Sequence, residues 1–364
     1  MIICNVVGAR PNFMKMAPVI NEQLSQGFNQ VFVHTGQHYD EKMSQIFFDE
    51  LKMPRPDLYF GVGSDTHARQ TARIMTEFEK FCVERKPDLV VVAGDVNSTL
   101  AAALVASKLH IPVAHVEAGL RSFDKTMPEE LNRIVTDHVS EFHFTTEHSA
   151  NENLVQEGIS PDKIHFVGNC MIDTLFSHLE RALDRRPWVP FSVSPGEYAL
   201  LTLHRPSNVD RHETLAKLAS MINKVSESLP VIFPVHPRTA KQIASSDISF
   251  ARRVILCEPL AYLSFLGLMS KSRVVITDSG GIQEETTALG VPCLTLRANT
   301  ERPSTVLLGT NRLVDPNGSD VHTAMQEILS DKWRKGEMPP LWDGFASRRI
   351  CEIISSFIKT FQTV

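Results

Sequence analysis

Short apolar runs alternate with longer amphipathic stretches along most of this chain. Apolar runs bounded by small or polar residues are typical of buried parallel strands, and the stretches between them are typical of covering helices. In the first half the predicted strands are Ile2–Val7, Val31–Thr35, Leu89–Ala93, Val113–Val116, Phe142–Thr145 and Ile164–Val167. In the second half they are Tyr198–Leu203, Val231–Val235, Val254–Leu256, Val274–Thr277, Pro292–Leu296 and Leu313–Val314.

The two halves repeat one organisation. Each contains a strand, an aspartate turn, a helix and a proline-bearing strand, with Asp95 and Asp278 at corresponding turns. The pattern predicts two Rossmann-like, doubly wound α/β domains that face one another across a cleft. We expect the first domain at residues 1–169 and the second at 170–345. A closing segment, 346–364, contains an amphipathic helix that is expected to pack back across the domain junction.

Composition excludes several classes of protein. The chain has 364 residues, 43% of them hydrophobic, and a formal net charge of −5 without any basic run, so a nucleic-acid footprint is not expected. Its longest apolar stretch, Val254–Met269, is interrupted by Glu258 and Pro259, so no membrane span is predicted. The six cysteines are scattered, which favours unpaired thiols and a cytoplasmic location.

The most informative stretch is Asp278–Glu285, which follows the apolar run Val274–Thr277. The stretch predicts a strand, then a glycine turn, then the N-terminus of a helix. In that arrangement free backbone N–H groups converge on one point, which suits a bound phosphate. Ser279 adds a hydroxyl, while Gly280 and Gly281 allow close approach. Glu284 and Glu285 are expected in the first helical turn, where a carboxylate can accept hydrogen bonds from a ribose. The alternative is an ordinary turn with carboxylates that offset the helix dipole.

Charged residues also follow strands of the first domain. Arg10 and Lys15 come after the first strand, where they favour a pyrophosphate over a purely structural role. Asp95 follows another strand, either as a chemical group or as a helix cap. Glu117 ends the next strand beside Gly119. It is a candidate acid or base, because a metal site shared with His115 lacks further ligands at suitable spacing.

Two further groups carry candidate chemistry. Glu129 and Glu130 open a helix with Arg133 one turn later, which also fits dipole compensation and an ion pair between Glu129 and Arg133. His204 ends the first strand of the second domain. Histidines at such a strand end are more often ligand contacts than core residues.

Several stretches combine these residues in order: GARPNFMKMAP, TGQHYD, GDVNST, HVEAGLRS, MPEELNR, LTLHRPSNVD, DSGGIQEE and NTERP. Together, from Met1 to about Phe361, they resemble the non-hydrolysing UDP-N-acetylglucosamine 2-epimerases. The resemblance implies the two-domain glycosyltransferase-B architecture, no cofactor, no metal and a homodimer. It also implies UDP bound mostly against the second domain.

The resemblance assigns roles residue by residue. Ser279, Gly280 and Gly281 would hold the pyrophosphate, Glu285 the ribose and Phe265 the uracil, while Arg10, Lys15 and Arg302 would also contact the substrate. The proposed catalytic set would be Asp95, Glu117, Glu129 and His204, with Arg133 close by.

One position departs from the family. The family often has HRxEN where this chain has His204–Asn208, so Ser207 replaces a glutamate. A role of that glutamate in binding a second, regulatory substrate molecule is therefore not expected here. The segment Gln37–Asp40 also differs from the versions associated with that regulatory site.

The expected reaction is epimerisation at C2 of the sugar, in support of bacterial surface polysaccharide synthesis. The C2 hydrogen has no adjacent carbonyl, and the dinucleotide fingerprint is missing, so elimination of UDP to 2-acetamidoglucal and its re-addition are favoured. The alternatives are a 2-epimerase of a UDP-diacetamido uronic acid, a hydrolysing epimerase, a UDP-sugar glycosyltransferase and a sensor without catalysis.

Overall fold

The chain forms two compact α/β units. The computed structural model describes residues 1–37, 41–315 and 320–362. Unit 1 contains Met1–Ser177 and Pro340–Val364, and unit 2 contains His178–Pro339. The division falls inside helix α7 (Cys170–Asp184), whereas the boundary expected from the sequence preceded that helix.

Unit 1 is built on a seven-stranded, fully parallel sheet with the order β3-β2-β1-β4-β5-β6-β7. Its strands are β1 (Ile3–Val7), β2 (Gln30–His34), β3 (Leu58–Tyr59), β4 (Leu89–Ala93), β5 (Val113–Ala118), β6 (Phe142–Thr145) and β7 (Ile164–Phe166). Its helices are α1 (Arg10–Ser25), α2 (Glu41–Glu50), α3 (His67–Arg85), α4 (Asn97–Lys108), α5 (Pro128–Val139) and α6 (His148–Gln156). The strand order reverses between β1 and β4, so this sheet is doubly wound, as predicted.

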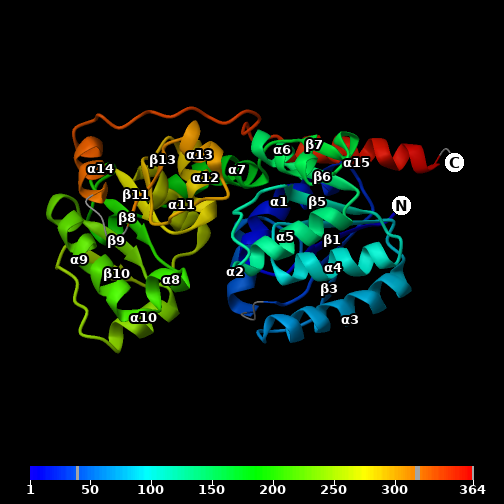
Figure 1. The fold of residues 1–364 in the computed structure, drawn as a ribbon, viewed down its shortest axis with the longest axis horizontal. Helices are drawn as coiled ribbons and strands as arrows, with labels where there is room; N and C mark the ends of the chain where they lie inside the picture. Colours follow the sequence, from blue (N-terminus) through cyan, green and yellow to red (C-terminus); the bar gives the residue numbers. More distant parts are fainter. Residues whose placement is uncertain (38–40, 316–319, 363–364) are drawn as a thin grey trace. The chain divides into compact units, whose positions relative to one another are not determined.

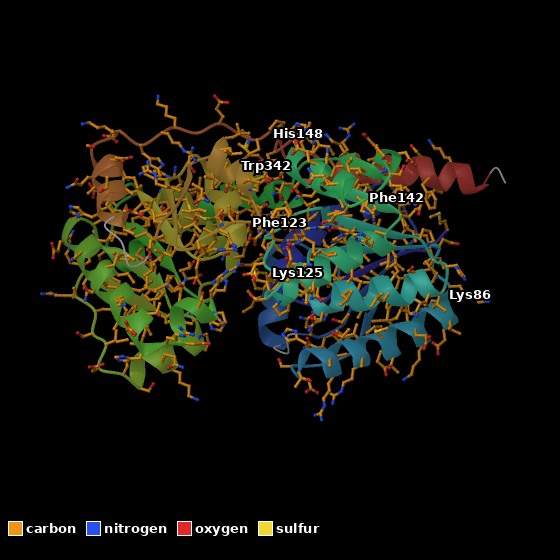
Figure 2. All side chains as sticks on the ribbon, viewed as in Figure 1. Lys86, Phe123, Lys125, Phe142, His148 and Trp342 are labelled. Carbon is orange, nitrogen blue, oxygen red and sulfur yellow. The ribbon has the colours of Figure 1, made fainter. Side chains whose placement is uncertain are left out.

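The end of the chain returns to unit 1. The indole Nε1 of Trp342, labelled in Figure 2, donates to the carbonyl oxygen of Thr146 at 2.8 Å. The Asp173 carboxylate accepts the backbone N–H groups of Ala346 and Ser347, at the start of α15 (Ala346–Gln362). Helix α15 then packs against α1. These contacts assign α15 to unit 1.

Unit 2 has a six-stranded parallel sheet with the order β10-β9-β8-β11-β12-β13 (Figure 1). Its strands are β8 (Ala199–Thr202), β9 (Val231–Pro234), β10 (Val254–Cys257), β11 (Val274–Thr277), β12 (Cys293–Thr295) and β13 (Asn311–Leu313). Its helices are α8 (Pro206–Val209), α9 (His212–Ser228), α10 (Pro237–Ala244), α11 (Tyr262–Lys271), α12 (Gly280–Leu289), α13 (Pro303–Leu307) and α14 (Asp320–Leu329). Here the order reverses between β8 and β11, which confirms the second doubly wound sheet.

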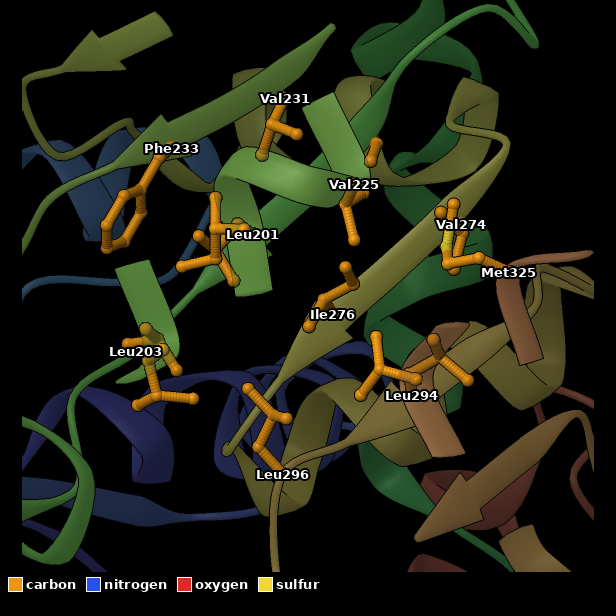
Figure 3. Close-up of a cluster of buried hydrophobic side chains, with 14 of the residues drawn as sticks. Leu201, Leu203, Val225, Val231, Phe233, Val274, Ile276, Leu294, Leu296 and Met325 are labelled. Carbon is orange, nitrogen blue, oxygen red and sulfur yellow. The ribbon is translucent and has the colours of Figure 1, made fainter. Parts of the chain in front are cut away.

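Alternate strand residues build the core of unit 2. Leu201 and Leu203, Val274 and Ile276, and Leu294 and Leu296 belong to one buried cluster, shown in Figure 3. Successive side chains of a strand point to opposite faces, so these pairs share one face of the sheet. Val225 of α9 and Met325 of α14 cover that face. This packing fixes the strand ends at which the candidate site lies.

Three sequence expectations can be judged on the fold. The cysteines are unpaired as predicted, and all except Cys257 are buried. The last strand begins at Asn311 rather than at Leu313. Among residues 1–37, 41–315 and 320–362, no helix has the length and apolar character that crossing a membrane requires.

Candidate functional site

Unit 2 brings the ends of β8 and β11 together at the point where its strand order reverses. Ligands of doubly wound sheets bind outside the carboxyl ends of the strands at this point. His204 follows β8, and Asp278 and Ser279 follow β11, so the sequence prediction placed these residues correctly at one sheet edge. The two strands are direct neighbours, with Thr202 opposite Thr277.

Asp278 organises this edge, although the sequence analysis gave it no role of its own. The carboxylate is fully buried and accepts the backbone N–H groups of His204 at 3.1 Å and of Arg205 at 3.0 Å. The Asn208 side-chain amide also donates to it, at 3.0 Å. Burial raises the pKa of a carboxyl group, but hydrogen bonds, with His204 foremost, outweigh burial and lower the pKa of Asp278. Asp278 is therefore a carboxylate that ties the β8 turn to the β11 turn.

The imidazole of His204 is oriented by the same carboxylate. Its Nδ1 lies 2.9 Å from Asp278 Oδ1, while 49% of the side chain is exposed. Since a carboxylate only accepts, Nδ1 carries a proton in this arrangement. Nε2 is then the nitrogen available to a ligand, as an acceptor in the neutral ring or a donor in the cation. A second proton would make His204 a partner for an anion.

The predicted order of strand, turn and helix is confirmed around Ser279, but Gly280 and Gly281 belong to the first turn of α12 and do not form a turn before it. Ser279 is the N-cap residue and its side chain makes no capping hydrogen bond, and α12 begins directly at Gly280. The first N–H groups of a helix have no partner within the helix, so they are available to an anion. A Cβ atom at Gly280 would lie 2.5 Å from Arg302 Nη1 and 3.0 Å from Glu301 Oε1. A side chain at that position would therefore displace the neighbouring ion pairs.

The expectation that Glu284 and Glu285 lie in the first turn of this helix is wrong. Because α12 starts at Gly280, no acidic residue falls in its first turn. Glu284 instead pairs with Arg302 Nε at 2.9 Å. Glu285 is buried and accepts a hydrogen bond from Tyr262 Oη at 3.1 Å. Burial, together with the charge of Glu284, raises the pKa of Glu285 to about 7 against the opposing effect of Tyr262.

Arg302 and Phe265 occupy different surroundings within unit 2. Arg302 is buried, and its Nη1 donates to Glu301 Oε1 at 2.6 Å, so it already balances two carboxylates. Phe265 lies on α11, which packs against α12, and is partly exposed beside the buried Leu266. Its partial exposure is compatible with the predicted contact to a planar base, which stays a prediction.

In unit 1 the corresponding reversal point lies between β1 and β4. Gly94 follows β4 with φ of +66°, and a Cβ atom there would lie 2.7 Å from Lys15 Nζ. Lys15, on α1, forms an ion pair with Glu117, and both side chains are nearly buried. The structure thus brings Lys15 and Glu117 together at the carboxyl edge. Of Arg10 only the backbone, at the start of α1, is described; its side chain, like residues His38, Tyr39 and Asp40, lies outside the described part.

Glu117 has an unusual backbone conformation. Its φ is +68°, a region that side chains other than glycine seldom occupy. The register of β5 against β6 shifts between Val116 and Ala118, so Glu117 forms a bulge inside the strand. Such bulges and strained residues concentrate at functional sites, where they direct a side chain. The sequence gave no sign of this bulge.

Arg133 joins Asp95 to the loop before α5. The guanidinium is buried and contacts the Asp95 carboxylate, while Nη1 donates to Glu130 at 2.9 Å. Glu130 also accepts the N–H groups of Ser122 and Phe123, both at 2.9 Å. That loop presents Phe123 and Lys125, both labelled in Figure 2, with the Phe123 side chain 78% exposed.

Glu129 differs from the other candidates. It lies in the first turn of α5, where its side chain is exposed. Asp95 is mostly covered, with 19% of its side chain exposed, and its backbone oxygen accepts from Asn132 at 2.8 Å. The three candidate carboxylates therefore differ in exposure: Glu117 is nearly buried in an ion pair, Asp95 is mostly covered, and Glu129 is exposed.

Comparison with known proteins gives one consistent result. Residues 22–355 match the family model described as UDP-N-acetylglucosamine 2-epimerase. A UDP-N-acetylglucosamine 2-epimerase of Methanococcus maripaludis is 42% identical over 96% of this chain and 97% of its own length. A UDP-2,3-diacetamido-2,3-dideoxy-D-glucuronate 2-epimerase of Pseudomonas aeruginosa is 39% identical, covering 98% of this chain and 99% of its own.

Solved structures agree with this match. The crystal structure of the Methanocaldococcus jannaschii UDP-GlcNAc 2-epimerase in complex with UDP-GlcNAc and UDP has a TM-score of 0.91 and 41% identity. It covers 98% of this chain and 100% of that one. A lipopolysaccharide outer core galactosyltransferase has a TM-score of 0.54 at 15% identity over 98% of this chain and 99% of its own, a likeness of fold alone. The glycosyltransferase-B type of architecture is thereby confirmed.

Proposed function

The chain belongs to the UDP-N-acetylglucosamine 2-epimerase family, and on this premise we propose that it interconverts UDP-N-acetylglucosamine and UDP-N-acetylmannosamine by inverting C2. The observation that carries the proposal is the 41% identity, over 98% of the chain, to an epimerase whose crystal structure is a complex with UDP-GlcNAc and UDP. In our proposal the enzyme is a cytoplasmic homodimer, and its product supplies surface polysaccharide synthesis.

Unit 2 is proposed to bind UDP. The free N–H groups at the start of α12 and the Ser279 hydroxyl would receive the diphosphate, since a helix N-terminus attracts anions. His204, held at Nδ1 by Asp278, would donate from Nε2 to a phosphate oxygen. Phe265 would cover the uracil, and Glu285 would accept from the ribose hydroxyls. Gly280 and Gly281 keep the approach to these N–H groups open.

The proposed reaction begins with elimination. The C1–O bond breaks and its electron pair leaves with the β-phosphate of UDP. A carboxylate removes the C2 proton, and the C–H electron pair forms the C1–C2 double bond of 2-acetamidoglucal. Arg10, Lys15, His204 and the start of α12 would stabilise the growing negative charge of UDP. Re-addition then requires a proton at the opposite face of C2 and attack of UDP on C1.

Glu117 is the favoured acceptor of the C2 proton among the carboxylates. Its contact with Lys15 and its place in the β5 bulge fix its carboxyl group at the edge of the sheet, where a positioned carboxylate can accept a proton. Asp95, paired with Arg133, and the exposed Glu129 are the candidates for the opposite face. In this assignment Arg133 holds Asp95 in place rather than contacting C2.

A second substrate is supported by one specific observation. The Pseudomonas aeruginosa relative, at 39% identity over 98% of this chain, is a 2-epimerase of a UDP-diacetamido uronic acid. The same elimination applies to that sugar, because C2 again bears an acetamido group next to C1. The two candidates therefore differ in substrate and share one reaction.

Incubation with UDP-N-acetylglucosamine in deuterated water, followed by proton NMR, tests the proposed function. We expect UDP-N-acetylmannosamine to accumulate to equilibrium, with deuterium at C2 of both epimers. A parallel reaction with the diacetamido uronate compares the two substrates. Release of free N-acetylmannosamine would identify a hydrolysing epimerase, and an unchanged sugar in both reactions would refute the proposal.

A further inference from the structure

Gln283 is the fourth residue of α12 and is fully buried. Its side-chain Nε2 donates to the backbone carbonyl oxygen of Ser279, the N-cap residue of the same helix, at 3.1 Å. A carbonyl oxygen only accepts hydrogen bonds, so the amide must present its NH₂ group to Ser279. The side chain of Gln283 therefore reaches back along its own helix and holds the peptide group at which the helix begins.

This peptide group sets the direction of the first backbone donor of α12. The carbonyl oxygen of Ser279 and the N–H of Gly280 belong to one planar peptide unit, so holding the oxygen also orients the N–H. The helix supplies one hydrogen bond to this oxygen, and Gln283 supplies a second. The second bond matters here because Gly280 and Gly281 follow, and glycine leaves the backbone more freedom than any other residue.

The oxygen end of the same amide is held by two other side chains. Oε1 of Gln283 accepts from Thr300 Oγ1 at 2.7 Å and from Asn311 Nδ2 at 2.9 Å. Asn311 starts β13 and is fully buried, and its Oδ1 accepts from Thr295 Oγ1 of β12 at 2.6 Å. The Gln283 amide is therefore fixed to β12 and β13 as well as to its own helix.

Thr300 connects this amide to the side chains beside Gly280. Its Oγ1 also accepts the N–H of Arg302 at 3.1 Å. Nη1 of Arg302 lies 2.5 Å from the position that a Cβ atom on Gly280 would take, and its Nε pairs with Glu284 at 2.9 Å. The loop that carries Arg302 and the start of α12 are thus joined through one buried glutamine.

We propose that Gln283 is a positioning residue for the diphosphate of the substrate, because its amide holds the Ser279–Gly280 peptide with the Gly280 N–H directed at the phosphate. The proposal rests on the proposed function for the place of the diphosphate at the start of α12. Gln283 is fully buried, so it acts through the backbone and does not touch the substrate. The neutral amide suits this task, since an ionised carboxylate of the same length could not donate to Ser279 and would repel a diphosphate.

Gln283→Met removes the amide and keeps the length of the side chain. The matched control is Gln23→Met, because Gln23 is also fully buried on a helix, α1 of unit 1, and its Oε1 accepts from Asn5 Nδ2 at 2.6 Å. Both variants should lose thermal stability, since each deprives a buried asparagine amide of an acceptor. Only Gln283→Met should change the binding of phosphate.

Calorimetry of the full-length proteins with UDP tests the positioning role. We expect Gln283→Met to bind UDP roughly tenfold more weakly than the wild type, the order of effect of one misdirected hydrogen bond to a charged group. Gln23→Met should bind UDP as the wild type does. Uridine, which has no phosphate, should bind equally to all three proteins in an NMR titration. Wild-type UDP affinity in folded Gln283→Met would overturn the proposal, and so would equal losses of UDP and uridine affinity.

The Gly280 N–H can also be observed without any ligand. Ser279–Gly280 is the only Ser–Gly pair in the sequence, so ¹³C in serine carbonyl groups and ¹⁵N in glycine, introduced by cell-free synthesis, single out this peptide by NMR. We expect its signal to shift in Gln283→Met and to stay in place in Gln23→Met. An unmoved signal in Gln283→Met would contradict the proposal. If the signal shifts but the wild type does not bind UDP, the hold on the peptide is supported and the proposed function is contradicted.

Thr300→Val provides a second variant. Valine keeps the shape of threonine and removes the hydroxyl that donates to Gln283, while the glutamine stays in place. We expect a smaller shift of the Gly280 signal and a smaller loss of UDP affinity than in Gln283→Met. If Gln283→Met does not fold, Thr300→Val decides the matter: wild-type UDP affinity together with an unmoved Gly280 signal would overturn the proposal.

Discussion

Replacement of Glu117 by glutamine is expected to lower kcat by about 10²–10⁴-fold, the usual effect of removing one positioned acid or base. Glutamine fills the same space and keeps an oxygen near Lys15, but it cannot accept the C2 proton. Glu117 is held by the ion pair with Lys15 and by the bulge at φ of +68°. UDP affinity should change little, because the groups proposed to hold the diphosphate, the ribose and the uracil before the reaction belong to unit 2, and Lys15 is proposed to act on the charge that grows as the C1–O bond breaks. Steady-state kinetics and calorimetry with UDP measure the two quantities.

The control for this variant is Glu141→Gln. Glu141 also pairs with a lysine of unit 1, Lys163 at 2.9 Å, but on the surface. Its loss should change neither kcat nor UDP affinity, since exposed ion pairs contribute little. Thermal unfolding of Glu117→Gln shows whether Lys15, left buried without its carboxylate, lowers stability. If the folded Glu117→Gln enzyme has a near-normal kcat, Asp95 or Glu129 would have to be the group that removes the C2 proton.

Gly281→Val is expected to weaken UDP and UDP-N-acetylglucosamine together, by at least roughly tenfold, or about 1.4 kcal/mol. Gly281 lies in the first turn of α12, where the free N–H groups point to the predicted phosphate position. A β-branched side chain would occupy the approach to these groups. Because ground-state binding is affected, KM should rise with the dissociation constant of UDP. Calorimetry with UDP measures the effect without turnover.

Ala288→Val places the same side chain near the opposite end of α12 and is the matched control. Its UDP affinity should equal that of the wild type. If Gly281→Val also binds UDP with wild-type affinity, the start of α12 is not the phosphate site. The assignment of UDP to unit 2 would then lose its main structural support.

The hydrophobic pattern predicted most strands of both sheets, because a parallel strand is covered on both faces and is therefore an apolar run. The hydrophobic pattern missed strand residues that are polar and form hydrogen bonds inside the fold. Asn311 starts β13, and its amide donates to Gln283 at 2.9 Å and to Thr305 at 3.1 Å. The two-residue β3, with Tyr59 exposed, was too short to predict.

The candidate site was predictable as a set of positions, and its internal connections were not. Residues at or just after the carboxyl ends of strands meet at one sheet edge, which located Asp95, Glu117, His204 and Ser279 within their own sheets. Which side chains pair depends on contacts between distant parts of the chain. Asp278 holds His204 across 74 positions, and no local spacing encodes that contact. The positive φ of Glu117 likewise coincides with a register shift between β5 and β6, which residue spacing does not encode.

Positional isotope exchange tests the elimination mechanism most directly. UDP-N-acetylglucosamine would carry oxygen-18 in the bridge between C1 and the β-phosphate. If the C1–O bond breaks in every epimerisation, the β-phosphate of UDP can rotate before re-addition. We then expect label in the non-bridging β-positions, together with traces of 2-acetamidoglucal and free UDP. Inversion of C2 with solvent deuterium incorporated, but with the label still in the bridge and no glycal formed, would contradict elimination.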